Sequence, residues 1–440
     1  MIDIRGLRED PELVKQLLGR RGVEASVVEE LAAADSALRD AVSARDELRS
    51  RVNDTSRRVA EAYRNRETAE AERLKEESRR LGTELEGIAA EAAELEQRRK
   101  ELWLVIPNVP SEDAPVGAGE EDNVVVRYWS AEGGSSAAAP NLDYPEFKRV
   151  PHWDIGVELG ILDLERGAKL SGSMFPLYKG LGSRLIRALT SFALDEHSDA
   201  FLEIRPPTFV KRETMISTGH LPKFADDAYQ MERDDLWAIP TAEVPLTSMA
   251  RDEILEAEQL PLMMTAATPC FRREAGSAGR DTRGLLRLHE FDKVELMVYS
   301  TPAQAQEMHA EILRRAESLL RQLGLTYRVL DLCTGDLGAS SRRTFDLEVY
   351  APGVDRWLEV SSVSWFGDYQ ARRANVRYRT EPGGSIEFVH TLNGSALAWA
   401  RVIAALLETG READGSVALP AVLTPYLRGV ARIERPGSEI

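Results

Sequence analysis

The length, composition and charge of the chain exclude several classes of protein. A chain of 440 residues is longer than one hydrophobic core usually supports, which predicts two domains. Apolar residues make up 43% of it, and no apolar run approaches the ~18 residues of a membrane-spanning helix. The net charge of −17 gives no sign of a nucleic-acid binder, so any RNA site has to be a local basic cluster.

The N-terminus and the cysteines indicate a cytoplasmic protein. Residues 1–8 lack the basic and apolar segments of a signal peptide. Cys270 and Cys333 are isolated in the sequence, which favours two buried core residues over a disulfide framework or a zinc site. We therefore expect a reducing, cytoplasmic setting, with no membrane and no DNA among the partners.

Two heptad patterns near the N-terminus predict an arm of two long helices, and no proline interrupts either pattern. The first comprises Leu31, Ala34, Leu38, Ala41, Leu48, Val52, Val59 and Ala62, and the second comprises Leu74, Leu81, Leu85, Ile88, Ala92, Leu95 and Leu102. Each helix would span about 50 Å, and the short polar stretch 63–71 between them requires an antiparallel return. Arg45 occupies a seam position and is expected to reach solvent.

Charge is uneven along this arm. Residues 45–66 carry seven basic side chains against four acidic ones, whereas residues 67–101 are net negative. The outer part of the first helix is therefore the best candidate for contact with RNA phosphates. The arginines expected to make it are Arg45, Arg49, Arg57, Arg58, Arg64 and Arg66. A solvated coiled-coil face is the alternative that charge alone leaves open.

A change of composition predicts a linker and then a second domain. Residues 106–151 are rich in Pro, Gly, Ser and Asp, as linkers are. Beyond them lie helical patterns at 181–197 and 302–323 and strand patterns at 294–299, 344–350 and 357–364. The last two strands flank residues 351–355, which suit a hairpin turn. We therefore expect an α+β fold with an antiparallel sheet rather than a doubly wound one.

The segment 270–291 holds the densest set of chemistry-bearing residues. Two runs lead into and out of a loop rich in Gly and Arg, and arginine binds phosphate with a two-pronged geometry. Phe291 is placed to stack on a base. A surface hairpin with solvated arginines is equally compatible with this composition.

Carboxylates mark further candidate positions. Glu295 sits in the apolar run 294–299, where a buried carboxylate needs either a substrate hydroxyl or amine or a structural partner. Asp346 and Glu348 lie two apart on one predicted strand and Glu359 lies on the next. Such acids hold magnesium against nucleotide phosphates, although rim carboxylates facing water fit the same pattern.

Residues 391–401 pass from a predicted strand into a helix that runs to about Leu407. Small hydroxyl and amide groups at the helix start, with Arg401 inside the helix, suit a small polar ligand beside a phosphate. An ordinary capped helix is the alternative.

Taken together, these residues resemble the bacterial seryl-tRNA synthetases over nearly the whole chain. The matching motifs include Thr-Ala-Glu-Val-Pro-Leu at 241–246, Thr-Leu-Asn-Gly-Ser at 391–395 and the block 271–295, together with 1–4, 169–173, 333–336 and 368–373. The resemblance implies a class II synthetase: a homodimer that uses ATP and Mg²⁺ to charge tRNA(Ser), and tRNA(Sec) where the host has it. It implies a tRNA-binding domain with a coiled-coil arm at 1–107, a linker leading into the core at 108–150 and a class II catalytic domain at 151–440. The dimer-interface motif would be 180–207.

The resemblance also assigns roles to residues. Those expected to bind L-serine are Thr241, Glu243, Arg272, Glu295, Asn393 and Ser395. Those expected to bind ATP are Arg272, Arg273, Glu274, Arg287, Leu288, Phe291, Glu359, Ser362 and Arg401. The metal would be held by Glu359, Ser362 and Glu348, and the catalytic residues would be Arg272, Arg401 and Glu359. In this family the arm grips the tRNA, which favours RNA contact for the six arginines.

Three positions depart from the usual pattern of the family: Trp365, Trp399 and the run 409–411. They leave open a duplicate copy tied to antibiotic resistance or biosynthesis. A second alternative is a synthetase-like ligase that loads an amino acid onto a carrier protein, but such an enzyme has no need of the arm. A third is a coiled-coil scaffold with a dead nucleotide site, which the complete set of Arg and Glu ligands disfavours.

Overall fold

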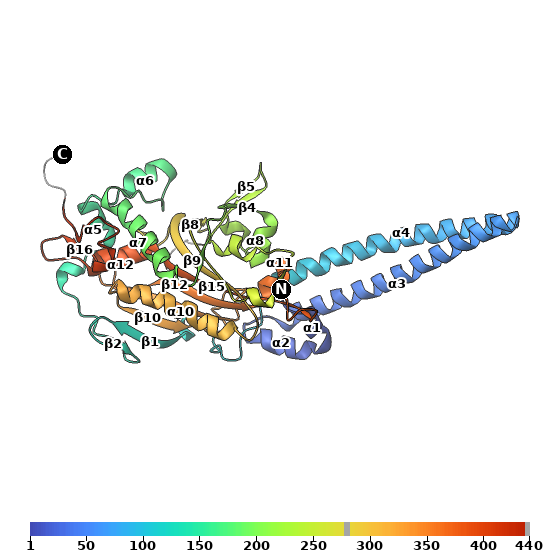
Figure 1. Cartoon of the computed structure of the whole chain (residues 1–440), viewed down its shortest axis with the longest axis horizontal. Coiled ribbons are helices and arrows are strands. Elements are labelled where there is room, and N and C mark those ends of the chain that lie inside the picture. The colour runs from blue at the N-terminus through green and yellow to red at the C-terminus, as the bar shows by residue number, and fades with distance from the viewer. Residues whose placement is uncertain (277–281, 436–440) are drawn as a thin grey trace. The chain divides into compact units, whose positions relative to one another are not determined.

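The computed structural model describes residues 1–276 and 282–435, which form two compact units (Figure 1). One unit is Ile2–Ile106, and the other includes the described chain from Pro107 onward. Among the described residues, no helix is both long and apolar enough to cross a membrane. Cys270 and Cys333 are buried free thiols, as predicted.

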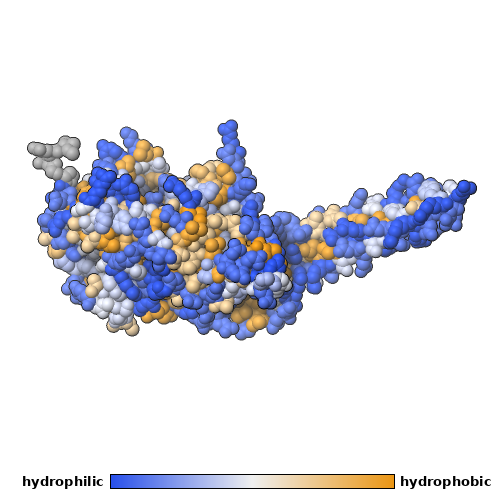
Figure 2. Space-filling view, in the orientation of Figure 1, coloured by the Kyte–Doolittle hydropathy of each residue, from blue (hydrophilic) through white to orange (hydrophobic). Residues whose placement is uncertain are grey.

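The N-terminal unit is an antiparallel pair of long helices preceded by two short ones. Its helices are α1 (Ile4–Glu9), α2 (Pro11–Gly19), α3 (Ala25–Arg64) and α4 (Thr68–Val105). Helices α3 and α4 lie side by side, which confirms the predicted arm (Figure 1). The visible surface of the arm is largely hydrophilic (Figure 2). The turn spans only 65–67 instead of the predicted 63–71. It is shorter because Ala62, Ala71 and Leu74 form a buried cluster that supports the last turn of α3 and the first turns of α4.

The seam of the arm contains a buried carboxylate that the heptad pattern did not reveal. The predicted seam residues that are buried are Leu31, Leu38, Leu48, Ala62, Leu74, Leu81 and Ala92. Asp35, only 2% exposed, lies among them and binds Arg8 over 2.7 Å and Arg99 over 3.2 Å. The hydrogen bond from Arg8 is the main reason that the pKa of Asp35 is lowered despite its burial. Arg45 binds Asp46 and keeps 29% of its side chain exposed, as expected for a charged seam residue.

A nine-stranded sheet forms the framework of the second unit. In spatial order its strands are β2 (Gly134–Ser136), β1 (Val124–Ser130), β10 (Tyr327–Asp331), β11 (Arg343–Ala351), β12 (Arg356–Gly367), β15 (His390–Ala398), β9 (Glu290–Ser300), β8 (Leu262–Phe271) and β3 (Leu202–Glu203). All neighbours are antiparallel except β3 and β8, which confirms the predicted sheet type. Strands β11 and β12 form the predicted hairpin.

Part of the segment predicted as a linker, 108–150, belongs to this sheet. Strand β1 pairs with β10, and Val125 packs on a buried cluster that includes Leu330. The run 124–126 is all valine, a residue that favours strands, but the surrounding Gly, Ser and Asp obscured the signal. The prediction of a linker is therefore wrong for this part of the segment.

Helices cover one face of the sheet. Helices α7 (Leu181–His197), α10 (Ala305–Gln322) and α12 (Trp399–Thr409) pack on it through the main hydrophobic core, and the first two confirm the helices predicted at 181–197 and 302–323 (Figure 1). The remaining helices are α5 (His152–Glu158), α6 (Leu164–Ser171), α8 (Arg212–Thr218), α9 (Glu243–Thr247) and α11 (Tyr369–Ala374). The remaining strands are β4 (Phe209–Lys211), β5 (Gln230–Met231), β6 (Leu236–Ala238), β7 (Ile254–Glu256), β13 (Arg377–Arg379), β14 (Ile386–Phe388), β16 (Val417–Ala418) and β17 (Arg432–Ile433).

Strand β9 shows why polar residues collect on the other face. Its Leu296 and Val298 belong to the main core beside the helices, whereas Met297 and Tyr299 belong to a separate core that α9 and α11 help to build. Successive strand residues point to opposite faces of a sheet. Glu295 and Lys293 are therefore directed away from the main core, toward the face that holds the site.

Candidate functional site

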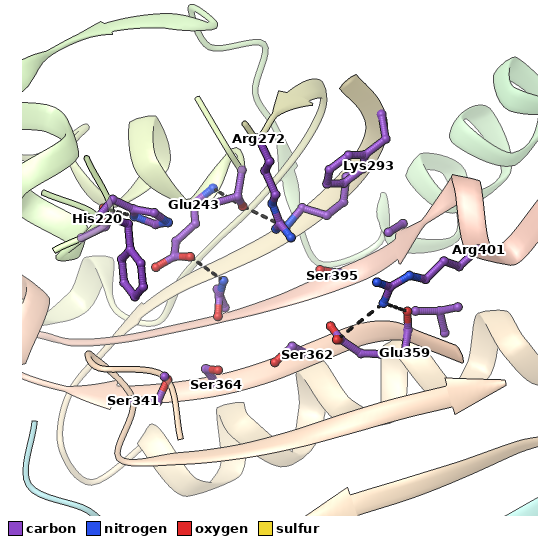
Figure 3. Close-up of a pocket in the computed structure, with 18 of the residues that line it drawn as sticks. His220, Glu243, Arg272, Lys293, Ser341, Glu359, Ser362, Ser364, Ser395 and Arg401 are labelled. Carbon is purple, nitrogen blue, oxygen red and sulfur yellow. Dashed lines mark hydrogen bonds and ion pairs between the residues drawn. The ribbon is translucent and has the colours of Figure 1, made fainter. Parts of the chain in front are cut away.

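A cavity of about 300 Å³ lies on this open face, over β9, β12 and β15 (Figure 3). The predicted serine- and ATP-binding residues that line it are Thr241, Glu243, Arg272, Glu274, Arg287, Leu288, Phe291, Glu359, Ser362, Asn393, Ser395 and Arg401. The fold thus brings together in one cavity residues that are widely separated in the sequence.

A buried hydrogen-bond network forms one wall of the cavity. The Thr241 hydroxyl donates to Glu295 Oε2 over 2.7 Å and accepts from Lys293 Nζ over 2.9 Å. Asn393 Nδ2 donates to Glu243 Oε2 and to Glu295 Oε1, each over 3.1 Å. Glu295 is fully buried, and none of the other four residues is more than 7% exposed. Two carboxylates, an ammonium and two neutral polar groups are thereby held ready for a small polar ligand.

Glu243 has an unusual proton affinity. Its pKa is raised to about 7, first by burial, which disfavours the charge, and next by the nearby carboxylate of Glu295. Gln370 opposes this shift, because its Nε2 donates to Glu243 Oε1 over 2.6 Å. Thr391 in turn holds Gln370 through a hydrogen bond of 2.8 Å. A carboxylate whose pKa lies near neutral pH suits a cationic amine as ligand, because the charge of the amine favours the ionised form of the carboxylate.

Among the described residues that line the cavity, sequence reasoning missed two ionisable ones, Lys293 and His220. Lys293 forms an ion pair with Glu295 and precedes it by two positions on β9, so strand periodicity was the signal that could have found it. His220 lies beside Glu243 in Figure 3, and burial followed by the charge of Arg272 lowers its pKa to about 3. His220 follows α8 in an irregular segment, where no periodic pattern marks it.

Arginines line another part of the cavity. Arg287 pairs with Glu274 over 2.6 Å, and the guanidinium of Arg272 lies 5.1 Å from the ring centroid of Phe291. Arg401 donates to the backbone oxygen of Glu359 over 2.8 Å. Three guanidinium groups facing one cavity suit a polyphosphate. Residues 277–281 of the loop rich in Gly and Arg lie outside the described residues.

Three residues predicted to bind serine, ATP or the metal are absent from the described lining of this cavity: Glu295, which is fully buried behind it, Arg273 and Glu348. Arg273 is exposed and is absent from the described lining of the cavity, because adjacent residues of an extended segment point in opposite directions and Arg272 points in. Its backbone N–H instead donates to the oxygen of Asp227 over 2.8 Å. Glu348 pairs with Arg328 and lines a second cavity of about 770 Å³, which shares Glu359 and other wall residues with the first.

The second cavity contains a further acid, Asp346. Its Oδ1 is buried without a hydrogen-bond partner in the described structure. Burial, and then the charge of Glu359, raise the pKa of Asp346 well above its ordinary value. The three predicted acids, Asp346, Glu348 and Glu359, all line this second cavity, and Glu359 also lines the first.

A β-bulge in β12 places Glu359 on the same side as Ser362. Leu347 pairs with Ser361 and Glu348 pairs with Glu359, so Val360 is an extra residue in β12. Residues three apart point to opposite faces of a regular strand, but the extra residue restores a common face. Glu359 and Ser362 therefore line the same cavity (Figure 3).

The tryptophans that depart from the family pattern lie beside the site. Trp399 is 1% exposed, packs in the main core at the start of α12, and has no hydrogen-bond partner for Nε1 among the described residues. Trp365 lies in β12, with the guanidinium of Arg342 5.0 Å from its ring centroid and His390 on its edge. Neither indole is among the described groups that line the smaller cavity.

Comparison with known proteins bears on the family. Residues 1–110 match the seryl-tRNA synthetase N-terminal domain, and residues 225–410 match the tRNA synthetase class II core domain (G, H, P, S and T). The chain is 45% identical to the serine–tRNA ligase of Citrifermentans bemidjiense, over 98% of this chain and 100% of that protein.

Solved structures agree with these matches. A seryl-tRNA synthetase from Pyrococcus horikoshii complexed with ATP has a TM-score of 0.89 at 36% identity, over 99% of this chain and 100% of that one. A cytoplasmic serine–tRNA ligase from Naegleria fowleri in complex with AMP has a TM-score of 0.82 at 28% identity, over 97% and 96% of the two chains. On these grounds the chain belongs to the seryl-tRNA synthetase family, which its own residues had indicated.

Proposed function

We propose that the protein is an ATP-dependent serine–tRNA ligase, which forms seryl-adenylate and transfers the seryl group to the 3′ end of tRNA(Ser), and of tRNA(Sec) where the host has it. One observation carries the proposal: a buried network of Thr241, Glu243, Glu295 and Asn393 shares one cavity with the arginines that suit a triphosphate. The serine–tRNA ligase from C. bemidjiense, which this chain covers completely, supports the same activity.

The buried network recognises serine. Thr241 and Glu243 receive the ammonium group of serine, and Glu295 and Ser395 receive its hydroxyl. Asn393 supports the pocket through its bonds to both carboxylates. Alanine lacks the hydroxyl and would forfeit its hydrogen bonds to Glu295 and Ser395, and such a loss discriminates strongly between substrates.

The arginines bind ATP and stabilise the developing charge. The serine carboxylate attacks the α-phosphorus in line, and pyrophosphate leaves; a ribose hydroxyl of the terminal tRNA nucleotide then attacks the carbonyl of the adenylate and releases AMP. Arg272 bridges the carboxylate and the α-phosphate, and it leaves the ring of Phe291 so that adenine can stack there. Arg287 and Arg401 meet the outer phosphates or the far face of adenine, and Glu274 also contacts the nucleotide. Positioning and electrostatic stabilisation supply the catalysis.

The donor set beside the phosphates fits Mg²⁺. Glu359 and Ser362 offer hard oxygen ligands in the cavity, and Glu348 lies in the adjoining one. No group of three or more His, Cys, Asp or Glu within the described ranges is arranged to hold a metal by itself, which suits an ion that arrives with nucleotide phosphates. When bound, Mg²⁺ neutralises phosphate charge.

The arm and a second copy of the chain complete the enzyme. The six arginines of the outer arm grip the tRNA through its backbone and shape, as is usual for helical RNA. The dimer interface involves α7 and β3, where Leu202 is 59% exposed in the single chain. The enzyme works in the cytoplasm. The match of residues 1–110 to the seryl-tRNA synthetase N-terminal domain disfavours the carrier-protein ligase and the scaffold.

Pyrophosphate exchange with each standard amino acid, followed by charging of total bacterial tRNA, tests the proposal. Exchange with serine alone, together with acylation of tRNA(Ser), is the expected result. Exchange without acylation would favour the carrier-protein ligase, and the absence of any exchange would favour the scaffold.

A further inference from the structure

A histidine and a glutamate form a pair that is buried behind the cavity. His152 is the first residue of α5, and Glu408 lies near the end of α12. Both side chains are 0% exposed, and Nδ1 of the histidine lies 2.8 Å from Oε1 of the glutamate. Neither residue is among those that line the two cavities.

The hydrogen bonds of His152 define its tautomer. The backbone N–H of Leu285 donates to His152 Nε2 over 3.0 Å, so this nitrogen carries no proton. The proton is therefore on Nδ1, which donates to Glu408. A protonated imidazolium would present an N–H to the Leu285 N–H and would break that contact. The geometry requires a neutral ring that connects Glu408 to Leu285.

Glu408 connects this ring to two further segments. Besides Nδ1, its carboxylate accepts from the N–H groups of His152 over 3.0 Å, Gly353 over 2.7 Å and Val354 over 3.3 Å. Every partner is a donor, which suits an ionised carboxylate in a buried position. Gly353 and Val354 form the turn between β11 and β12, the hairpin that carries Glu348 and Glu359. One buried carboxylate therefore fixes the start of α5, the end of α12 and this turn.

The segment 284–287 links the pair to the site. Leu285 is held by His152, and Arg287, two residues later, lines both cavities. The oxygen of Leu286 accepts from Arg401 Nε over 3.1 Å. Gly284 packs directly on the ring, because a Cβ added there would come within 2.5 Å of His152 Nε2. A shift of Leu285 would consequently move two of the arginines that face the cavity.

We propose that His152 and Glu408 are positioning residues for ATP, which hold segment 284–287 where Arg287 and Arg401 meet the triphosphate. This inference rests on the proposed use of the cavity for ATP. Neither residue touches substrate; the pair acts through Leu285 and through the turn at Gly353. Displacement of a phosphate-binding group by 1 Å costs on the order of a hundredfold in rate, so one lost hydrogen bond at Leu285 is a measurable change.

Two substitutions at His152 separate its two contacts. In His152→Gln, the amide oxygen takes the position of Nε2 and keeps an acceptor for Leu285. In His152→Asn, the amide nitrogen takes the position of Nδ1 and keeps a donor for Glu408, but the side chain is too short to reach Leu285. We expect the KM for ATP in pyrophosphate exchange, measured per folded active site, to rise roughly tenfold or more in the Asn variant. The Gln variant should stay near the parent, and the KM for serine should change in neither.

His197→Asn is the matched control. His197 is a buried histidine of α7, 1% exposed, whose ring nitrogens have no partner among the described residues. The same substitution there should lower thermal stability without changing the KM for ATP. If neither His152 variant folds, Glu408→Gln, which turns an amide group toward the N–H donors, is measured in the same way and should raise the KM for ATP.

The measurements distinguish a failure of this proposal from a failure of the proposed function. An unchanged KM for ATP in folded His152→Asn, or a larger rise in the Gln variant than in the Asn variant, would overturn the proposal. Equal rises in the KM values for ATP and serine would also overturn it, because they indicate general disruption. Absence of serine-dependent exchange in the parent protein would instead reject the proposed function.

Discussion

The hydroxyl of Thr241 donates to the carboxylate of Glu295 over 2.7 Å, although 54 residues separate the two in the chain. The same hydroxyl accepts from Lys293, which is also ion-paired with Glu295. Thr241 therefore holds a buried anion and a buried cation in one arrangement. The serine pocket depends on that arrangement, because either charge left without its partner in a buried site is costly.

Thr241→Val tests this dependence. Valine has nearly the same shape but offers neither a donor to Glu295 nor an acceptor to Lys293. We expect the free energy of unfolding to fall by about 1–3 kcal/mol and the KM for serine to rise roughly tenfold or more, with the KM for ATP unchanged. Denaturant titration and pyrophosphate exchange measure the two effects.

Thr265→Val is the control for this substitution. Thr265 is 1% exposed and donates to the backbone oxygen of Glu295 over 3.0 Å, but it is absent from the described lining of the cavity. It should lose stability without a change in the KM for serine. If both variants raised that KM equally, the specific role of Thr241 would be wrong.

The raised pKa of Glu243 predicts that serine binding depends on pH. Free Glu243 is protonated below a pH of about 7, but the ammonium of serine requires the ionised carboxylate. The KM for serine should therefore fall as the pH rises from about 6, and level off above about 7. Serine binding near neutral pH should release a proton, which calorimetry in buffers of different ionisation enthalpy detects. Glu243→Gln should bind serine weakly and without this dependence; an unchanged pH profile in that variant would contradict the assignment.

The raised pKa of Glu243 also affects the stability of the protein without serine, and there a rise in pH is unfavourable. The folded pKa lies above the usual value of 4.5, so between pH 4.5 and 7 the folded state binds more protons than the unfolded state. Glu243 therefore makes the free protein less stable as the pH rises through this window. Saturating serine should remove that contribution.

Periodicity and the family motifs predicted the elements of this fold but not the irregularities that shape its site. Strand patterns located β9, β11 and β12. They did not reveal the extra residue Val360, which aligns Glu359 with Ser362. A second irregularity lies in β15, where Ser395 pairs with Glu295 but Ala398 pairs with Lys293, and Leu397 adopts a positive φ of 75°. Bulges depend on pairing between distant strands, so a single strand pattern carries no signal for them.

Partners that are distant in the sequence explain the other differences. The heptad pattern carried no signal for the burial of Asp35, because Arg8 and Arg99, which make that burial possible, lie 27 and 64 residues away. The family resemblance assigned Arg273 to ATP, but the direction of its side chain is decided by the local backbone. The role of His152 was equally hidden, since its partners are Leu285 and Glu408.

Removal of the arm should separate the two half-reactions. The contacts between Ser56 and Ser78 and between Tyr63 and Glu72 set an antiparallel pairing in which residues 40 and 95 lie nearly opposite, so deletion of 40–95 leaves ends that a short turn can join. We expect serine-dependent exchange to continue and tRNA charging to be lost.

A charge-neutralised arm provides the matched comparison. Arg49→Ala with Arg58→Ala on α3 should raise the KM for tRNA and reduce its salt dependence, because phosphate contacts are lost. Arg73→Ala with Arg79→Ala on α4, where each arginine pairs with a glutamate of its own helix, should have a smaller effect. Full charging by the deletion variant would show that the arm has no role in tRNA binding.

Glu359→Gln should raise the Mg²⁺ requirement of the reaction. The Glu359 carboxylate is 48% exposed, and its ion-pair partner among the described residues is Arg401 at 3.6 Å, so little of the fold depends on it. An amide is a weaker ligand for a hard cation than a carboxylate. The Mg²⁺ concentration for half-maximal exchange should increase several-fold at fixed ATP. Glu348→Gln, which loses a pair with Arg328, is the comparison and should shift it less.

His197 predicts an acid sensitivity that is independent of catalysis. Burial, and then the charge of Arg315, lower its pKa from 6.5 to about 4, so the unfolded state binds more protons as the pH falls through that window. Stability is therefore lost between about pH 6.5 and 4. His197→Phe should remove this loss. The unfolding free energy of the variant, relative to that of the parent protein, should therefore increase by about 2 kcal/mol between pH 8 and pH 4.5. His309→Phe is the contrast, because His309 Nε2 bonds Val363 O over 3.0 Å and its loss should destabilise the protein at pH 8. If the difference in unfolding free energy between His197→Phe and the parent stayed constant with pH, His197 would not titrate in this range.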